Sequence, residues 1–413
     1  MQEIKVKPWY KMTELGVIPD DWEVKDISDI ADVVGWWTPS TTNSSFWNWN
    51  IDWFTPTEIW EKKYSFSSVR KITDEWLQSS SAKILPKGTI LLTSRAWIWD
   101  ISILWKEACT NQWFQSLVPK LNTSSEFLYY LTWTLKSELL KNASWSTFLE
   151  ISPLHVKRIK VIYPSYKEQN NIAKSLSDID NLIFSIDKLI KKKKQIKEWS
   201  IKELLTWKRI LNWFTWKWET VKLRALVDAY KWSWLSKEKL TENWTNECIL
   251  YWELFTTYDR VISKVLNKTD YNEWTLSKKD DILLPWSTTT TWIDLATSSA
   301  IFKDNILLWW DINILRRKSK KYHSLFLSYY LTNIDRDKIA ELAQWTTIIH
   351  LYWKDLLWLD IRIPLDYDYQ SSVVKVLSDM DSEIENIEIK RSKYKQIKEW
   401  MMQELLTWKT RLV

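Results

Sequence analysis

The residues that could carry out catalysis are few and scattered. The chain has three histidines, His155, His323 and His350, and two cysteines, Cys109 and Cys248. No histidine has serine and aspartate partners at a spacing that indicates a hydrolase triad, and neither cysteine has a CxxC partner that would indicate a zinc site. We therefore expect structural histidines, buried thiols and no metal site.

Other catalytic motifs are also missing. Neither a GxGxxG nor a GxxxxGK[ST] pattern occurs, and no proline pair follows Asn or Asp, as an amino-methyltransferase site would carry. Pro19-Asp20 followed by Glu23-Val24-Lys25 comes nearest to a nuclease motif, but this spacing is too tight for a strand-borne metal site. We interpret Glu23 and Lys25 as a charged entry to a helix or strand and expect no active site.

Composition indicates a chain with sizeable cores and no membrane segment. Its 413 residues are 45% hydrophobic and 27% charged, which favours two to three domains. No apolar run reaches the ~18 residues of a membrane helix, and the low cysteine content suits the cytoplasm. The formal charge of +6 is compatible with a nucleic-acid partner.

The chain has 34 Trp and only 3 Gly, although glycine usage averages about 7%. Trp36-Trp37-Thr38-Pro39, Pro285-Trp286-Ser287 and Trp309-Trp310-Asp311 stand where glycine turns are expected, and Trp207 stands where a helix should end. We interpret most tryptophans as glycines whose UGA codon has been read as Trp. The alternative is a protein that is truly rich in Trp. Trp22, Trp47, Trp53 and Trp218 fit as themselves.

An internal repeat organises the chain. Lys194-Gln195-Ile196-Lys197-Glu198-Trp199 recurs as Lys395-Gln396-Ile397-Lys398-Glu399-Trp400, at an offset of 201 residues. Leu176-Ser177-Asp178-Ile179-Asp180 and Leu204-Leu205-Thr206-Trp207-Lys208 recur at the same offset, which indicates internal duplication. Upstream the match is looser, and we pair Tyr129-Tyr130 with Tyr329-Tyr330. Each unit thus has a variable front and a nearly constant end.

The constant ends are predicted to be long helices. A helix over 168–206 would be roughly 58 Å long, too long for one small domain to cover. Its apolar residues recur like the a and d positions of a coiled coil, so we predict that the two copies pair. The alternative is two amphipathic helices, each packed on its own domain. The predicted seam residues are Ile172, Leu176, Ile179, Ile183, Ile186, Leu377, Met380, Ile384 and Ile387.

The variable fronts are predicted to be α+β. Runs rich in β-formers over 89–93 and 159–163 alternate with turn signals, and helices are predicted over 125–141 and 323–342. We place the fronts at 1–163 and 212–363, and the constant ends at 164–211 and 364–413.

These segments resemble the specificity subunit of type I restriction–modification enzymes. Thr13-Glu14-Leu15-Gly16-Val17-Ile18-Pro19 looks like the family's opening. The stretch from Trp36 through Phe46-Trp47-Asn48-Trp49 to Ile51-Asp52-Trp53 is similar to its GGTPS and YWNG pattern, and Leu85-Pro86-Lys87-Gly88-Thr89-Ile90 also fits. The likeness covers essentially the whole chain, and its departures are almost all Trp for Gly.

The resemblance implies two target-recognition domains in tandem pseudo-repeat, joined by two long helices that form an antiparallel coiled coil. Each domain would read one half of a split double-stranded DNA site. Two modification subunits would carry S-adenosylmethionine, and motor–nuclease restriction subunits would use ATP and Mg²⁺. The chain itself would hold no cofactor and no active site.

Base readers and phosphate contacts are expected around the glycine-like turns of each front. Arg95 is the best single reader, because Thr93-Ser94-Arg95 follows a strand-like run. The threonine run of the second front can equally be a β-rich turn, and Arg316 and Arg317 can equally belong to a solvated loop. The candidates are Arg70, Lys83, Thr93, Ser94, Arg95, Gln112, Gln115, Ser287, Thr288, Thr289, Thr290, Arg316 and Arg317.

Two other functions stay open. One is a coiled-coil adaptor that binds proteins without reading DNA, and the other is a nuclease that uses Glu23 and Lys25. Salt-dependent binding to duplex DNA separates the first from a specificity subunit, because phosphate contacts release counterions. Cleavage by the isolated chain with Mg²⁺ would favour the second.

Overall fold

The chain folds into two compact units in a computed structural model. Unit 1 comprises residues 1–187 and 389–413, and unit 2 comprises residues 188–388. Each unit holds a front and half of each long helix, whereas the boundaries predicted from the repeat kept each helix whole. The structure describes residues 8–35, 46–60, 62–78, 83–95, 100–141, 144–145, 149–206, 208–209, 211, 218–230, 246–269, 275–343, 349–407 and 409–412.

The two long helices are α7 (Tyr166–Leu205) and α12 (Tyr367–Leu405). The Ser165 hydroxyl and the Asp366 carboxylate each accept a backbone N–H three residues further on, at 3.3 Å and 2.7 Å. These caps satisfy amides that have no partner within the first turn. Within the described ranges, no helix has the apolar stretch that a membrane span requires.

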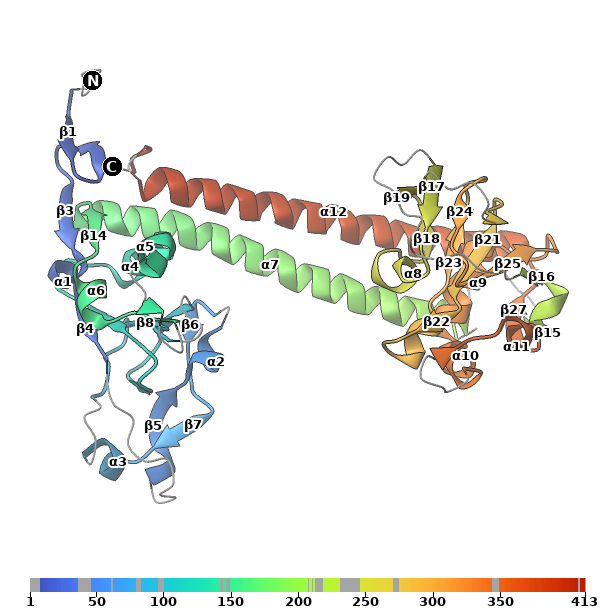
Figure 1. Cartoon of the computed structure of the whole chain (residues 1–413), viewed down its shortest axis with the longest axis horizontal. Helices are drawn as coiled ribbons and strands as arrows, with labels where there is room; N and C mark the ends of the chain where they lie inside the picture. Colours follow the sequence, from blue (N-terminus) through green and yellow to red (C-terminus); the bar gives the residue numbers. More distant parts are fainter. Residues whose placement is uncertain are drawn as a thin grey trace. The chain divides into compact units, whose positions relative to one another are not determined.

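The long helices pack together as predicted and run in opposite directions (Figure 1). In unit 1, Asp180 pairs with Lys398 at 2.7 Å and Asp187 pairs with Arg391 at 3.1 Å. Residue numbers therefore increase along α7 in the direction in which they decrease along α12, so the helices are antiparallel. Unit 2 shows the same order in the pairs Lys193–Glu383, Lys194–Glu388 and Lys197–Asp381. Of the predicted seam, Ile172, Leu176, Ile179, Ile183, Ile186, Leu377 and Ile384 are buried, and Met380 and Ile387 are half-buried.

Unit 1 is built on a five-stranded sheet in the order β4-β11-β8-β9-β6 and a three-stranded sheet in the order β10-β5-β7. The pairs β6–β9 and β10–β5 are parallel, and the others are antiparallel. The strands are β4 (Ala31–Val34), β5 (Trp47–Phe54), β6 (Tyr64–Ser65), β7 (Arg70–Ile72), β8 (Ile90–Leu92), β9 (Ile101–Leu104), β10 (Cys109–Thr110) and β11 (Ser116–Pro119).

Among the described residues, unit 2 repeats this topology and has one further strand, β20, in its second sheet. Its five-stranded sheet has the order β16-β25-β21-β23-β18, and its second sheet the order β19-β17-β24-β20. The parallel pairs, β18–β23 and β17–β24, stand at the same places as in unit 1, so two fronts of divergent sequence share one fold. The strands are β16 (Val227–Tyr230), β17 (Asn246–Ile249), β18 (Val261–Ile262), β19 (Asn267–Thr269), β20 (Thr275–Leu276), β21 (Asp281–Pro285), β23 (Ser299–Ile301), β24 (Leu307–Leu308) and β25 (Ile312–Arg317).

The helix predicted in each front is in fact two helices. They are α4 (Ser125–Thr134) with α5 (Lys136–Lys141), and α9 (Ser324–Asn333) with α10 (Arg336–Glu341). The prediction of one continuous helix was wrong, because in each front the chain turns at the end of the first helix. Threonine hydroxyls of α4 bond its own carbonyls, and in α9 the amides after Asn333 both return to one carbonyl.

A two-stranded ribbon leads into each long helix. In unit 1, β3 (Glu23–Asp26) pairs with β14 (Lys160–Tyr163), and in unit 2, β15 (Trp218–Lys222) pairs with β27 (Asp360–Pro364). The remaining elements are β1 (Tyr10–Thr13), β2 (Gly16–Pro19), β12 (Ser144–Trp145), β13 (Leu149–Glu150), β22 (Ser287–Thr288), β26 (Ile349–His350), α1 (Ile27–Ile30), α2 (Pro56–Ile59), α3 (Asp74–Gln78), α6 (Pro153–Lys157), α8 (Glu253–Thr256), α11 (Trp353–Leu356) and 3-10 helices at Leu223–Ala225 and Trp292–Ala296.

Each core uses both long helices. In unit 1, Ile172 from the start of α7 and Leu405 from the end of α12 belong to the cluster that covers the five-stranded sheet. Arg411 fastens the segment after α12, because its guanidinium lies 2.8 Å from the buried Glu168 carboxylate and 2.7 Å from Asp21. In unit 2 the roles are exchanged: the core takes Val373 and Leu377 from the start of α12, and Leu204 and Leu205 from the end of α7.

The backbone at Trp9 agrees with the interpretation of tryptophan as glycine. Its φ is 69° and its side chain is 83% exposed, a conformation that favours glycine. Trp22 is buried instead, and its indole N–H donates to Glu168 Oε2 at 2.9 Å, as expected of a true tryptophan. The predicted glycine turns at Trp286, Trp309 and Trp310 do not have a positive φ, so the backbone there does not favour glycine over another residue. Trp36, Trp37 and Trp207 lie outside the described residues.

Candidate nucleic-acid interface

The predicted readers of unit 1 begin where β8 ends. Thr93 and Ser94 are buried: Thr93 Oγ1 accepts the Asp100 N–H at 2.9 Å, and the Ser94 amide donates to the Trp113 carbonyl. Arg95 is the first side chain of this run to reach solvent. Its Nε lies 3.5 Å from Glu150 Oε2, with the two side chains 40% and 46% exposed. Such an exposed pair is weak, so Arg95 can exchange Glu150 for another acceptor.

The two glutamines occupy different environments. Gln112 is exposed. Gln115 is buried beside Gly35, where a Cβ on Gly35 would lie 2.9 Å from the Gln115 Oε1. A side chain at position 35 would therefore require the Gln115 amide group to shift. Within the described part of the chain, Gln115 Oε1 has no hydrogen-bond partner.

Basic side chains gather on the three-stranded sheet of unit 1 around a carboxylate that the sequence did not single out. Asp52 is buried, and its carboxylate lies 2.5 Å from Lys106 and 3.4 Å from Lys71. Burial opposes ionisation, but hydrogen bonds from Lys106, Ser68 and Ser67 hold the pKa of Asp52 at about 2. The predicted contacts Arg70 and Lys83 are exposed, and Arg70 lies 5.4 Å from the Trp47 ring centre.

The serine–threonine run of unit 2 caps a 3-10 helix. Ser287 and Thr288 are buried, and the Ser287 hydroxyl donates to Asp311 Oδ2 at 3.0 Å. Thr289 and Thr290 are exposed, but the Thr290 hydroxyl donates to Asp294 Oδ2 at 2.6 Å. The buried hydroxyls cannot reach a base edge as they stand, which leaves Thr289 as the accessible member.

Arg316 and Arg317 are bound within the fold. Arg316 donates to both oxygens of the buried Asp281, at 3.0 Å and 2.8 Å, and Arg317 donates to Asp280 at 2.9 Å. Hydrogen bonding to Asp281 raises the pKa of Arg316. Either arginine would have to leave its carboxylate to contact DNA.

Sequence reasoning missed a polar cluster that occurs in both units. In unit 1, the buried Tyr130 donates to Asp180 Oδ2 at 2.6 Å, and Lys398 lies 2.7 Å from the other oxygen of that carboxylate. Burial and the aspartate raise the pKa of Tyr130. We call each set of tyrosine, aspartate and lysine a clasp, because it joins the front to both long helices.

Unit 2 contains the same clasp, with Tyr329 donating to Asp381 at 2.6 Å and Lys197 paired with Asp381. The repeat offset aligns the aspartates and the lysines, so that signal was available. The tyrosines are shifted by one residue from the predicted pairing, because α4 begins at Ser125 and α9 at Ser324.

The residues considered for catalysis serve the fold where the structure describes their contacts. Lys25 pairs with Glu23 at 2.7 Å on β3. His323 caps α9 by accepting the Leu325 amide. Burial raises the pKa of both Cys109 and Cys248 to about 12, so these thiols stay protonated at neutral pH. Among the described residues, no group of three or more His, Cys, Asp and Glu could hold a metal ion.

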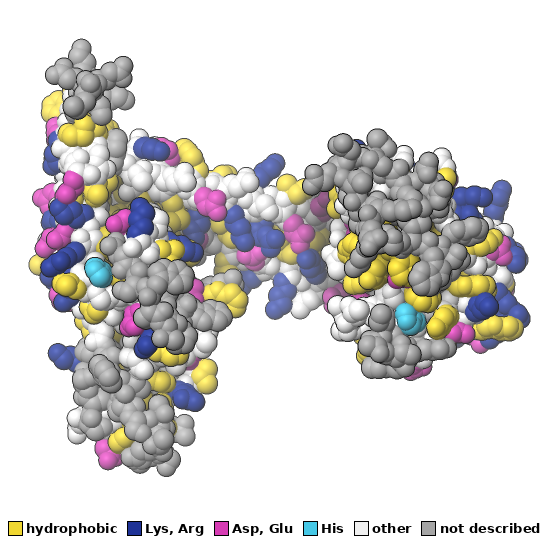
Figure 2. Space-filling model, viewed as in Figure 1, with side chains coloured by type: hydrophobic (Ala, Val, Ile, Leu, Met, Phe, Trp, Pro, Cys, Tyr) yellow, Lys and Arg dark blue, Asp and Glu magenta, His cyan; other side chains and the backbone are white. Residues whose placement is uncertain are grey.

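On the face shown in Figure 2, the described basic side chains do not form one continuous patch. Figure 2 shows Lys and Arg side chains interspersed with Asp and Glu on the visible side of each unit. Of the predicted readers, Arg70, Lys83, Gln112, Thr289 and Thr290 are exposed, and the side chain of Arg95 is 40% exposed.

The sequence matches a family model twice. The model is described as the type I restriction modification DNA specificity domain, and it covers residues 19–198 and 216–398. The MjaIX specificity subunit of Methanocaldococcus jannaschii, a type I restriction enzyme, is 42% identical over 209 residues, which are 50% of this chain and 46% of that protein. The MjaVIII specificity subunit from the same organism is 27% identical over 451 residues, which cover 100% of this chain and 98% of that protein.

Solved structures share the fold. The type I restriction–modification S subunit from M. genitalium aligns with a TM-score of 0.55 at 15% identity, over 93% of this chain and 96% of that one. A structure concerned with complex assembly and conformational transition of the type I system aligns with a TM-score of 0.59 at 11% identity, over 94% of this chain and 98% of that one.

Proposed function

The chain belongs to the family of type I restriction modification DNA specificity domains, and from this premise we propose that it reads a bipartite DNA site for a type I restriction–modification complex. Each front would read one half-site. The chain would be non-catalytic and would direct methylation or cleavage by its partner subunits.

One observation carries this proposal. Two fronts of divergent sequence keep the same strand order and the same parallel pairs, while their helical ends are nearly constant. Divergence on a retained scaffold is what two readers of different half-sites require, because base contacts must change while the frame that presents them must not. A protein-binding adaptor gives no reason for such divergence.

Arg95 is the proposed base reader of unit 1, with Gln112 beside the same sheet and Arg70 and Lys83 as phosphate contacts. Thr289 is the proposed polar contact of unit 2. These side chains reach solvent, and they belong to the types that pair with base edges and phosphates.

The partners follow from the family. Two modification subunits would bind the constant helices and carry S-adenosylmethionine, and motor–nuclease restriction subunits would supply ATP- and Mg²⁺-dependent cleavage. The complex would act on chromosomal and invading DNA in the cytoplasm.

Duplex binding by the full chain as a function of salt tests the proposal. A specificity subunit should lose affinity steeply as salt rises, because each phosphate contact releases counterions. Binding that is absent, or independent of salt, would instead favour the adaptor. Methylation-site mapping in cells with the complete system should then give one split motif, and substitutions confined to one front should change only one half of it.

A further inference from the structure

An internal comparison between the two units locates a cation that lacks its partner. The residue before β6 is Lys63, and the residue before β18 is Arg260. The Lys63 carbonyl accepts the Ile103 amide at 2.8 Å, and the Arg260 carbonyl accepts the Ala300 amide at 2.8 Å, so the two positions are equivalent.

In unit 1 this cation is fully satisfied by the chain itself. The Lys63 ammonium lies 2.7 Å from Glu126 Oε2, 2.9 Å from the Tyr130 hydroxyl and 2.8 Å from the Ser177 hydroxyl. Glu126 is the second residue of α4. Its carboxylate balances the positive charge of the half-buried Lys63 ammonium.

Unit 2 keeps the cation and lacks that carboxylate. The second residue of α9 is Leu325, which stands in the place of Glu126. The nearest described ion-pair partner of Arg260 is Asp259, at 4.0 Å from its Nε, and Asp259 also faces Lys197 at 3.8 Å. The guanidinium group of Arg260 is therefore half-buried, and most of its N–H groups have no hydrogen-bond acceptor among the described residues.

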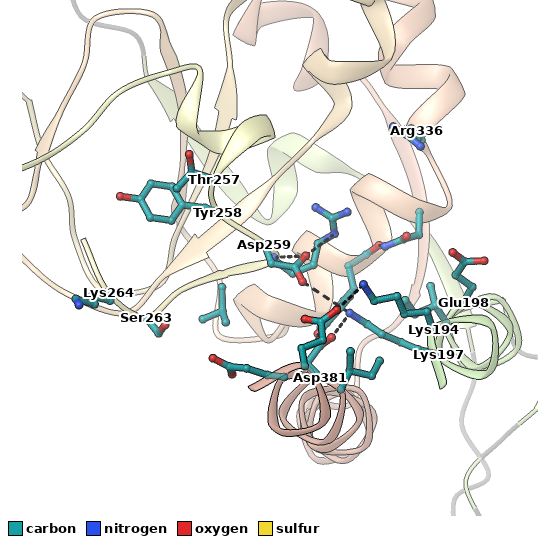
Figure 3. A pocket seen from close by; sticks show the side chains of 18 of the residues that line it. Lys194, Lys197, Glu198, Thr257, Tyr258, Asp259, Ser263, Lys264, Arg336 and Asp381 are labelled. Carbon is teal, nitrogen blue, oxygen red and sulfur yellow. Dashed lines mark hydrogen bonds and ion pairs between the residues drawn. The ribbon is translucent and has the colours of Figure 1, made fainter. Parts of the chain in front are cut away.

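A second arginine faces the same space. Arg336, the first residue of α10, makes no hydrogen bond or ion pair within the described part of the chain, and its Nε is buried. Its charge acts on Asp294, which also lines the smaller cavity and is bound by the hydroxyls of Thr290 and Thr291. Arg260 and Arg336 line one cavity of about 830 Å³ and an adjoining one of about 340 Å³. Figure 3 shows the larger cavity, with Arg336 and Thr257 on its walls. Burial and the nearby Arg336 charge lower the pKa of Arg260, although Asp259 opposes them.

We propose that this cavity of unit 2 binds a backbone phosphate of duplex DNA, held by Arg260 and Arg336. The inference rests on the proposed function, which supplies the phosphate polymer. Guanidinium groups bind phosphate through paired N–H donors, and an external anion here would restore the charge that Glu126 provides in unit 1. Of the long-helix acids that line the cavity, Asp381 and Glu388 are paired with Lys197 and Lys194. Glu198 and Glu385 also line it, but their side chains are exposed to solvent, which screens their charge.

The test compares three variants of the full chain on a labelled duplex of random sequence. Arg336→Gln removes one donor, and Leu325→Glu installs the internal carboxylate of unit 1. Lys338→Gln is the matched control, because Lys338 lies on the same helix, is bound to Asp335 and does not line either cavity. Loss of one phosphate contact should flatten the salt dependence by about 0.9 in log–log slope, or about eightfold in affinity near 0.1 M salt.

We expect both cavity variants to show this loss on every duplex and the control to bind like the wild type. Thermal melting with and without inorganic phosphate, at matched ionic strength, checks folding and asks whether the cavity takes a free anion. Unchanged slopes in both folded variants would overturn the inference, even if inorganic phosphate raised the wild-type Tm. If the wild-type chain itself bound no duplex, the proposed function would fail instead.

Discussion

The clasps make a prediction that does not depend on DNA. Tyr130→Phe should destabilise unit 1 and leave unit 2 unchanged, and Tyr329→Phe should do the reverse. Each tyrosine is buried and donates to a carboxylate of a long helix, so each substitution removes one charged hydrogen bond that ties a front to the helix pair.

The surroundings of the two tyrosines set the expected size. A hydrogen bond to a charged group contributes about 2 kcal/mol, which is roughly thirtyfold in a local opening equilibrium. Tyr329→Phe should cost this much, because Lys197 still neutralises Asp381. Tyr130→Phe should cost more, about 3 kcal/mol, because Tyr130 also accepts from the Lys63 ammonium at 2.9 Å.

Hydrogen exchange measured by mass spectrometry resolves the two units within one intact chain. Protection of α4 peptides should fall in Tyr130→Phe, and protection of α9 peptides in Tyr329→Phe. Each variant serves as the control for the other, and a double-mutant cycle with Asp180→Asn isolates the pairwise contribution. Equal loss in both units, or no loss in either, would refute the clasp as the link between front and helices.

Four further predictions follow from the sites described. Arg95→Ala should weaken recognition of one half-site by roughly 1–3 kcal/mol and spare the other, as read by methylation mapping; equal loss on all sequences would make Arg95 a phosphate contact. Asp52→Asn should lower local stability by about 2 kcal/mol at pH 7, because the pKa of Asp52 in the folded protein, about 2, lies below the ordinary 3.8. This stabilisation is present above pH 3.8 and is lost as pH falls toward 2, and amide hydrogen exchange of β5 and β7 measures it. Four residues inserted after Trp207 should change the number of base pairs between the half-sites without changing either half-site, and an unaltered motif in a fully active complex would count against it. Intact mass spectrometry of the protein from its natural source should give a value well below 49.9 kDa if most tryptophans are glycines, and a match to 49.9 kDa would reject that interpretation.

The sequence predicted the parts of the fold that repeat. The repeat offset of 201 residues revealed the two long helices. The spacing of Ile172, Leu176 and Ile179 revealed the seam between them, because the residues in contact in a coiled coil recur at regular short intervals along each helix. The common topology of the fronts could not be predicted from the sequence. Lys63 and Arg260, for example, occupy equivalent positions because their carbonyls accept the amides of Ile103 and Ala300, and these pairs of residues do not share a residue type.

The candidate readers were harder for a physical reason. Thr93 and Ser94 were expected near DNA, yet they continue β8, a central strand whose residues are buried on both faces. Arg316 was expected to contact DNA or to belong to a solvated loop, but its acceptor Asp281 lies 35 residues away on the neighbouring strand. Periodicity reports which residues alternate along a strand, and it does not report what the adjacent strand places opposite them.

Unit 1 is built from two separate segments of the chain, and this determines the order in which the two units can be completed during synthesis. Unit 2 is one continuous stretch, residues 188–388, whereas unit 1 also needs residues 389–413. Leu405 and Leu406 belong to the unit 1 core, and Arg411 neutralises the buried Glu168 there. The front that is synthesised first therefore completes its core last, after the later-made unit has all of its own residues. During that interval its unfilled apolar surface is open to chaperones, the reverse of the usual N-terminal-first order.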